Sequence, residues 1–231
     1  MAYREWAPPT ALQPAVACLW SHRVDADPNP VLPDGCSDVI WRAGVGAFVA
    51  GPDTGPNEVR LEPGTLLVGL RFRPGAGAAA LGLPLDRLRD ERVDVDDLLP
   101  HAGLHPDLAP AEAADALTRL AADGLDREGP DPAVQEAVDL LADPATDLFA
   151  VRREVGLGER QLRRRFVAAV GYGPKTLQRV LRFRRFLDHV DRGTALADAA
   201  ARTGFADQPH LNRECRDLAG LTPAQLADRW G

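Results

Sequence analysis

The sequence is poor in features that anchor a chain in a membrane or stabilise it outside the cell. None of the apolar runs in its 231 residues approaches the roughly 20 residues that a membrane-spanning helix needs. The first ten residues, MAYREWAPPT, lack the basic and apolar regions of a signal peptide. The three cysteines, Cys18, Cys36 and Cys215, are isolated and odd in number, which argues against a disulfide framework. We therefore expect a cytoplasmic protein with free thiols and no membrane partner.

Histidine clusters and catalytic motifs are also missing. His22 is alone in the first hundred residues, and the Pro/Gly-rich context of His101 and His105 does not favour the helix on which their spacing would suit a metal. The chain has neither a Gly-x-Ser-x-Gly elbow nor a phosphate-binding glycine loop. Cys36, in PDGCSDV, is the one candidate nucleophile, but no His or Lys is near it in sequence to lower its pKa, so a packing role is favoured. We expect no catalytic residue, metal or cofactor, and a protein that is not an enzyme.

Charge is distributed unevenly along the chain. The net charge is -7, yet residues 1–129 carry -9 and residues 130–231 carry +2. Within residues 146–231, 16 basic side chains face 10 acidic ones. Because this excess lies in one segment, the overall acidity does not exclude a nucleic-acid partner.

The first hundred residues predict short strands separated by Pro/Gly turns. The segments rich in Val, Leu, Ile, Trp and Phe are 16–24, 37–43, 47–51 and 64–74. They indicate a mainly β barrel or sandwich, followed by a short helix over 75–83 and a longer one over 109–125 with Gly124 near its end. We predict a two-domain α+β protein: a β-rich sensor domain over 1–105, a helical connector and linker over 106–129, and an all-α domain over 130–231.

The second half contains a quasi-repeat. The stretches GLGERQLRRRFVAAVGYGP (156–174) and GFADQPHLNRECRDLAGLTP (204–223) share a Leu, a Gly and a Pro at a constant offset of 49 residues. Each is typical of a helix that ends at a glycine, a sharp turn, and a second helix with one apolar stripe. We expect helix-turn-helix units at about 147–170 and 195–218.

Between the two units, residues 175–191 predict one continuous helix of roughly 25 Å. Recognition helices for successive major grooves on one face of DNA lie roughly 34 Å apart, which this spacer and the offsets within the units can supply. The exposed faces carry Arg, Gln and Asn, the side chains that pair with base edges. The alternative is that the basic helical half docks onto a protein partner.

The stretches GLGERQLRRRFVAAVGYGPKTLQRVLRFRRFL and ALADAAARTGFADQPHLNRECRDLAGLTPAQL resemble the AraC/XylS family of bacterial transcription regulators. The resemblance covers about residues 130–229 and implies a DNA-binding domain of two helix-turn-helix units, with double-stranded DNA and RNA polymerase as partners. It places base contacts on Arg160, Arg163, Arg164, Gln208, His210, Asn212 and Arg213. Arg182 matches a common linker-helix arginine, for which the resemblance implies a structural or phosphate-contacting role.

Three departures from the family pattern fall in the second unit. Leu211 and Cys215 stand where the family usually has two phenylalanines, and Pro209 replaces a small polar residue at the start of the recognition helix. The core of this unit loses volume and the helix loses one donor. We expect the second unit to bind more weakly than the first.

The first half resembles an N-terminal domain that often precedes AraC-type domains, through VLPDGCSDVIW (31–41), VAGPDTGP (49–56) and LVGLRFRPGAGAAALGLPLDRLRD (67–90). In this position the family usually has a β-rich module, often cupin-like, that binds an effector or mediates dimerisation. We therefore expect the first half to sense a small molecule or to form a homodimer. Candidate pocket residues are the aromatic and polar side chains on the strands, which could equally be plain core residues: Trp20, Trp41, Phe48, Arg71 and Phe72.

Overall fold

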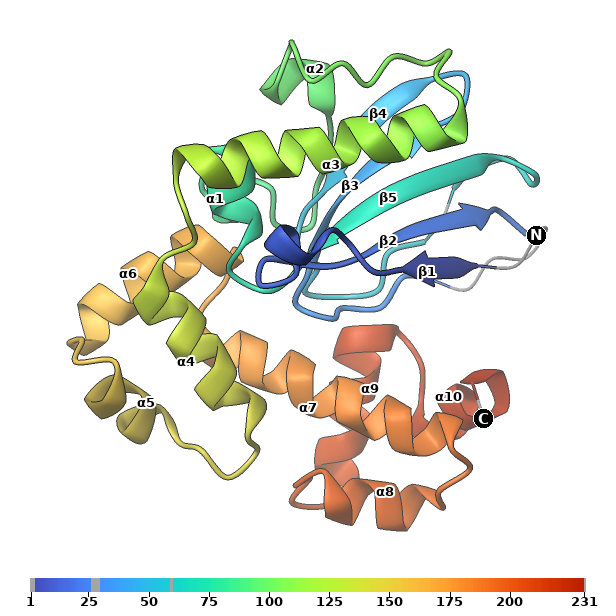
Figure 1. The fold of residues 1–231 in the computed structure, drawn as a ribbon. Helices are drawn as coiled ribbons and strands as arrows, with labels where there is room; N and C mark the ends of the chain where they lie inside the picture. The colour runs from blue at the N-terminus through green and yellow to red at the C-terminus, as the bar shows by residue number, and fades with distance from the viewer. Residues whose placement is uncertain (1–2, 26–29, 59, 231) are drawn as a thin grey trace.

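The computed structural model describes residues 3–25, 30–58 and 60–230. Within them, six strands form one antiparallel sheet in the order β1-β2-β5-β3-β4-β6 (Figure 1). The strands are β1 Arg4–Trp6, β2 Val16–Arg23, β3 Ser37–Arg42, β4 Gly46–Ala50, β5 Leu66–Phe72 and β6 Arg92–Asp94. The predicted α+β class with a mainly β first domain is confirmed. The strands form a single sheet, and helices take the place of a second sheet over one of its faces.

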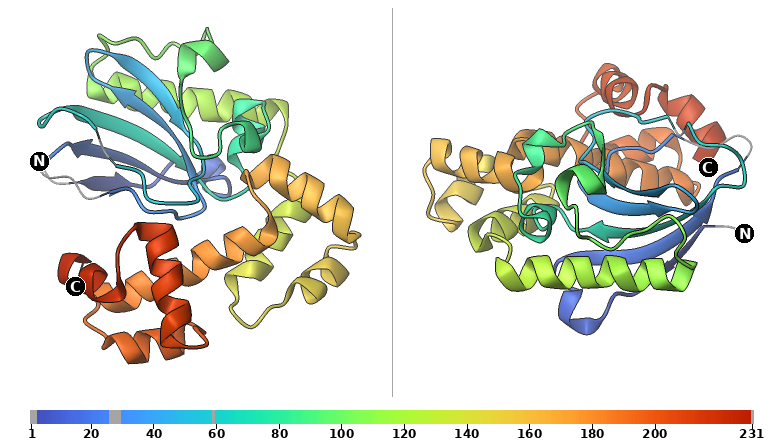
Figure 2. Two further views of the ribbon diagram at one scale, coloured as in Figure 1. Left: turned by 180° about the vertical axis from the view of Figure 1, so that it is seen from behind. Right: turned by 90° about the horizontal axis from the view of Figure 1, so that it is seen from above.

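The first core lies between that face and the helix α3 Pro110–Arg127, which crosses it, with the short helix α1 Gly77–Leu81 packed against α3 (Figure 2). Shorter elements η1 Thr10–Leu12, η2 Leu85–Arg87 and α2 Val95–Leu98 connect the layers. The sequence placed Gly124 near the end of this helix, and α3 ends three residues later, at Arg127. A Cβ at Gly124 would overlap the Ala80 carbonyl, so the glycine is required by the close packing of α1 on α3.

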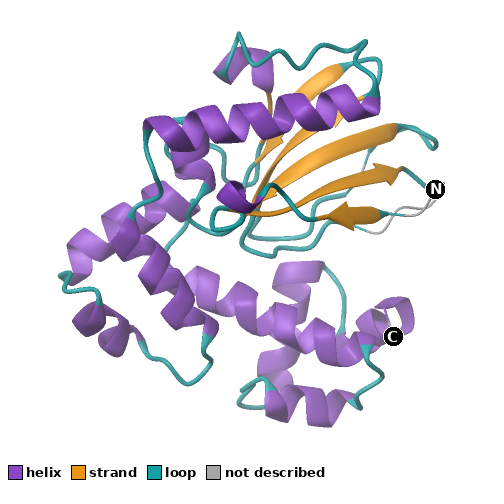
Figure 3. Ribbon diagram, in the orientation of Figure 1, coloured by secondary structure: helices purple, strands orange, loops and turns teal. Residues whose placement is uncertain are grey.

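The C-terminal half of the described chain is helical throughout (Figure 3). Its helices are α4 Pro132–Ala142, α5 Leu148–Glu154, α6 Glu159–Val170, α7 Pro174–Asp191, α8 Leu196–Arg202, α9 Gln208–Ala219 and α10 Pro223–Trp230. Two helix-turn-helix units, α5–α6 and α8–α9, flank the long helix α7, whose Phe183 and Phe186 are fully buried in their common core. None of the described helices is long and apolar enough to cross a membrane.

The two halves pack against each other through loops of the first domain (Figure 1). Leu32 belongs to the core of the helical half. Pro52 abuts Gly171, which has a φ of 93° and ends α6. A Cβ at Gly35 would come within 2.9 Å of the Leu177 side chain. The sheet, its loops and the helical half therefore form one packed unit.

Candidate nucleic-acid interface and ligand cavity

The first helix-turn-helix unit places its arginines on the open side of α6. Gly156, with a φ of 64°, makes the turn between α5 and α6. Leu162 and Phe166 are buried in the core that α6 shares with α4 and α7, while the side of α6 that carries its arginines is exposed. On that face lie the three predicted base-reading side chains, Arg160, Arg163 and Arg164, all exposed. Within the described residues, none of the three guanidiniums has a hydrogen-bond or ion-pair partner.

The fourth arginine of this run has a structural task. Arg165 Nε donates to Asp131 Oδ2 at 2.6 Å, and Asp131 also caps the start of α4 by accepting from the Ala133 amide at 3.1 Å. The hydrogen bond from Arg165 lowers the pKa of Asp131. This ion pair joins α4 to α6 and takes Arg165 out of the set that can read DNA.

The second unit has a better-capped recognition helix. Asp207 Oδ1 accepts from the His210 amide at 2.6 Å, and Pro209 lies in the first turn, where a missing N–H has little cost. The buried stripe of α9 consists of Leu211, Cys215 and Leu218. Gln208 and Arg213 are exposed and Asn212 is half-buried, all without partners among the described residues. These three side chains remain available for base contacts.

His210 and Arg182 are held by contacts within the protein. The Ala206 amide donates to His210 Nδ1 at 3.4 Å, and the His210 ring lies edge-on to Phe205 with ring centroids 5.4 Å apart. The Arg182 guanidinium lies over the same Phe205 ring at 5.2 Å. The structure therefore gives both side chains a role in building the turn between α8 and α9.

A further ion pair fixes the second unit on the linker helix. Arg179 Nε of α7 donates to both carboxylate oxygens of the buried Glu214 on α9, at 3.0 Å each, and Arg179 Nη2 reaches Asp217 at 3.2 Å. The sequence analysis missed this link because 35 residues separate Arg179 from Glu214 and no local pattern relates them. It sets the orientation of α9 relative to α7.

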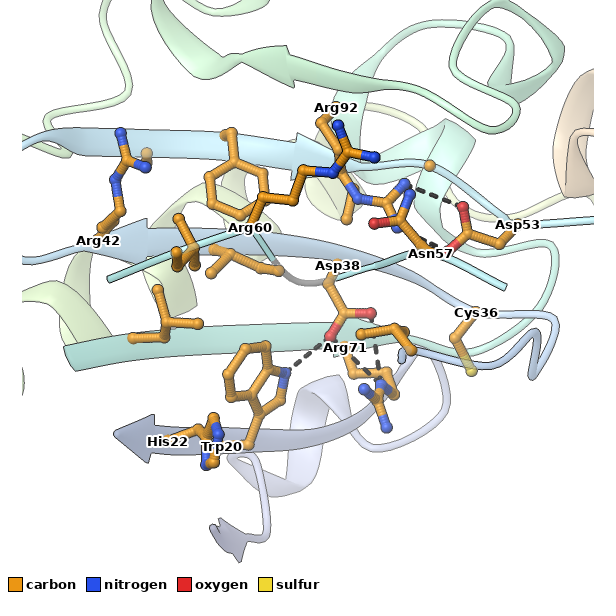
Figure 4. A pocket seen from close by; sticks show the side chains of 18 of the residues that line it. Trp20, His22, Cys36, Asp38, Arg42, Asp53, Asn57, Arg60, Arg71 and Arg92 are labelled. Carbon is orange, nitrogen blue, oxygen red and sulfur yellow. Dashed lines mark hydrogen bonds and ion pairs between the residues drawn. The ribbon is translucent and has the colours of Figure 1, made fainter. Parts of the chain in front are cut away.

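A cavity of about 630 Å³ lies on the sheet face that α3 does not cover (Figure 4). Strand alternation brings one side chain in two to this face, so Trp20 of β2, Ile40 of β3, Leu67 of β5 and Phe48 of β4 line it together. A Cβ at Gly69 would overlap the Trp20 indole, so this glycine lets the ring lie flat on the sheet. The cavity has an apolar floor.

One end of the cavity carries a satisfied polar network. Asp38 accepts from Trp20 Nε1 at 2.7 Å and from Arg71 Nε at 3.2 Å, and Arg71 Nη1 also faces Asp34 at 3.6 Å. Burial raises the pKa of Asp38, while the Arg71 guanidinium opposes that shift. Burial also raises the pKa of the neighbouring Cys36 thiol well above its usual value, which keeps the thiol protonated at neutral pH.

Other polar groups of the cavity are without partners. The buried atoms His22 Nδ1 and Arg42 Nε have no hydrogen bond within the described part of the chain. Both residues flank Leu67 in the register of the sheet, His22 from β2 and Arg42 from β3, so they lie at the same end of the cavity (Figure 4). Arg92, by contrast, is paired with Asp53 at 2.6 Å.

The five pocket candidates of the sequence analysis fall into two groups. Trp20, Phe48 and Arg71 line the cavity. Trp41 and Phe72 point to the opposite face and are fully buried beneath the helices, and Trp41 Nε1 donates to the His105 carbonyl at 2.8 Å. They are core residues because successive side chains of a strand point to opposite faces of the sheet, and these two point to the face that the helices cover. The same alternation, applied to 37–43, could have found Asp38 and Arg42, which the sequence analysis missed.

The comparisons with known proteins match two separate segments of the chain. Residues 4–94 match a domain family of unknown function (DUF6597), and residues 151–229 match a helix-turn-helix domain family. No curated protein sequence gives a significant match.

Among solved structures, ToxT from Vibrio cholerae bound to (E)-4-(8-methylnaphthalen-1-yl)but-3-enoic acid is similar with a TM-score of 0.50 and 8% identity, over 100% of both chains. Another structure of ToxT from Vibrio cholerae O395 gives a TM-score of 0.49 and 9% identity, over 92% of this chain and 97% of that one. At such identities the likeness shows the fold alone, a β-rich domain followed by helix-turn-helix units. The chain therefore combines a segment that matches the DUF6597 family with a C-terminal helix-turn-helix domain, and it is a DNA-binding transcription regulator.

Proposed function

We propose that α6 and α9 read two successive major-groove segments of one duplex. Arg160, Arg163 and Arg164 contact base edges from α6, and α9 contributes Gln208, Asn212 and Arg213. His210 orients the start of α9, and Arg182 supports the turn. One observation carries the proposal. The base-reading side chains of α6 and α9 have no partners among the described residues, and both helices pack on the single long helix α7.

The length of α7 supplies much of the separation between α6 and α9 that two successive major grooves require. The 18 residues of α7 extend about 27 Å. Offsets of the two units from its ends bring α6 and α9 toward the roughly 34 Å that separates major grooves on one face of DNA. Affinity then comes mainly from neutralised phosphates and falls steeply with salt, while each base contact contributes about 1–3 kcal/mol of discrimination.

The cavity is the proposed effector site. Its apolar floor, formed by Trp20 and Phe48, suits the body of a small molecule, and the unpartnered His22 Nδ1 and Arg42 Nε suit its polar end. Leu32 lines this cavity and also belongs to the core of the helical half. A bound molecule therefore touches Leu32, on which the DNA-binding half packs. The ligand can thereby affect the positions of α6 and α9 directly.

The remaining partners follow from the family. We propose that the regulator acts in the cytoplasm and contacts RNA polymerase when bound to DNA. A homodimer through the first domain is also proposed, because β1 is an edge strand and its Trp6 side chain is 40% exposed. None of these roles requires a catalytic step.

The test is a selection of random duplexes by the full chain at physiological salt. The expected result is an enriched motif with two blocks whose centres lie about one helical turn, or 10 base pairs, apart. A matched selection with Arg119→Ala, an exposed arginine on α3 away from both readers, should return the same motif. Absence of any enriched sequence would support the alternative, that the basic half docks onto a protein.

A further inference from the structure

The outward face of α6 is one wall of a groove whose other wall belongs to the first domain. The groove has a volume of about 1060 Å³. Arg160, Arg163 and Arg164 line it from α6, and Pro84, Asp86 and Arg87 line it from η2 and the residue before it. We call it the α6–η2 groove.

The segment η2 packs against α6 and comes close to its C-terminal end. A Cβ at Gly171 would lie 3.2 Å from the Leu85 carbonyl oxygen. Val167 and Ala168, in the last turns of α6, are half-buried, whereas Arg160 and Arg163 in the first turns are exposed. The first domain thus leaves the reading half of α6 open.

The α6–η2 groove is electropositive. Within the described part of the chain, Arg87 has no hydrogen-bond or ion-pair partner, like the three arginines that face it from α6. Two carboxylates line the same groove, and one of them, Glu159, is engaged by Arg152 at 3.0 Å. Asp86 is the other. Four guanidiniums without partners therefore outweigh the acidic groups, and a polyanion is the complementary occupant.

The position of Arg87 relative to α6 indicates which part of the DNA it meets. The N-terminal residues of a recognition helix contact base edges. A helix with its side chains is about 10–12 Å across and fills the major groove, which is about 12 Å wide. An element beside the C-terminal end of that helix lies outside the groove, over the sugar-phosphate backbone. On a duplex read by α6, Arg87 would therefore face phosphates, not bases.

We propose that Arg87 contacts a DNA phosphate beside the segment read by α6, so that the DNA interface includes both domains. The inference rests on the proposed reading of DNA by α6 and extends it to a residue outside the helix-turn-helix domain. Phosphate contacts position a protein on the duplex without reading its sequence. Arg87 should thus affect all duplexes alike.

The test measures the salt dependence of binding of the full chain and of Arg87→Ala to a selected duplex and to a scrambled one. Loss of one phosphate contact lowers the slope of log K against log salt by about 0.9. The affinity deficit of Arg87→Ala should then be about 3.5-fold larger at about 50 mM than at about 200 mM salt, on both duplexes. Because Arg87 is exposed and unpartnered, circular dichroism should show an unchanged fold.

The matched control is Arg119→Ala, which removes the same charge from the first domain outside the groove and should leave the slope unchanged. An Arg87→Ala slope equal to that of the parent chain overturns the inference and leaves the proposed function standing. Tighter binding by Arg87→Ala also overturns it, since η2 would then obstruct DNA. A parent chain that prefers no duplex overturns the proposed function and the inference together.

Discussion

Replacing Arg179 with methionine tests how the second reader is fixed on α7. The change removes the partner of Glu214, which is 8% exposed, and among the described residues it leaves the carboxylate with only His210 Nε2 at 3.7 Å. Breaking a buried ion pair from one side costs about 3–5 kcal/mol because a charge stays buried without compensation. The Arg179 side chain is itself 38% exposed, so water can enter the vacated space. We therefore expect a loss of stability at or below the lower end of that range, about 2–3 kcal/mol.

The matched control removes both partners. Arg179→Met with Glu214→Leu leaves no buried charge and keeps the contact between α7 and α9 apolar. Its stability should lie within about 1 kcal/mol of the parent chain, although it lacks the ion pair. A destabilised single variant and a recovered double variant distinguish an uncompensated charge from a general packing defect.

Urea unfolding of the full chain gives the change in free energy, and hydrogen exchange of the α9 amides shows whether the loss is local to that helix. The reasoning is refuted if Arg179→Met lies within about 0.5 kcal/mol of the parent chain. It is also refuted if the double variant is as unstable as the single one, because the buried carboxylate would then not be the cause.

Two further predictions concern the cavity. Asp38 has a raised pKa in the folded chain, so the folded state holds a proton that the unfolded state releases, and stability falls as pH rises from about 3.9 toward the folded pKa. The stability of Asp38→Asn relative to the parent should therefore increase across that window in urea unfolding at several pH values, and a constant difference would contradict the assignment. Compounds that raise the melting temperature of the parent chain should lose this effect in Ile40→Trp, which fills the cavity, and keep it in Ala111→Trp on the exposed side of α3. Shifts that persist in Ile40→Trp would place the ligand elsewhere.

The helical half could be predicted from the sequence because each helix-turn-helix unit buries apolar residues that recur at helical spacing within that unit. Leu162 and Phe166 lie four residues apart on one helix, and Gly156 marks a turn that needs a positive φ. These signals are local. The ion pair between Arg179 and Glu214 is not, since it depends on how α9 lies across α7, and periodicity within either helix does not specify that.

The first domain was harder to read because its pattern depends on pairing between distant strands. The strands β1 and β6 have three residues each and carry no alternation of their own, so the sequence did not reveal them. The sequence places Gly124 near the end of a helix but does not reveal why a glycine is needed there, which is the close approach of α1 and α3. The cavity combines side chains from five strands, and its composition follows only from the sheet order.

The central claim is that two helices of one chain read different segments of one duplex. The most direct measurement repeats the random-duplex selection with Arg164→Ala and with Asn212→Ala. The account predicts that Arg164→Ala loses preference in one block of the motif and Asn212→Ala in the other, with the blocks about 10 base pairs apart. A motif of one block, or loss of preference in the same block by both variants, would contradict it.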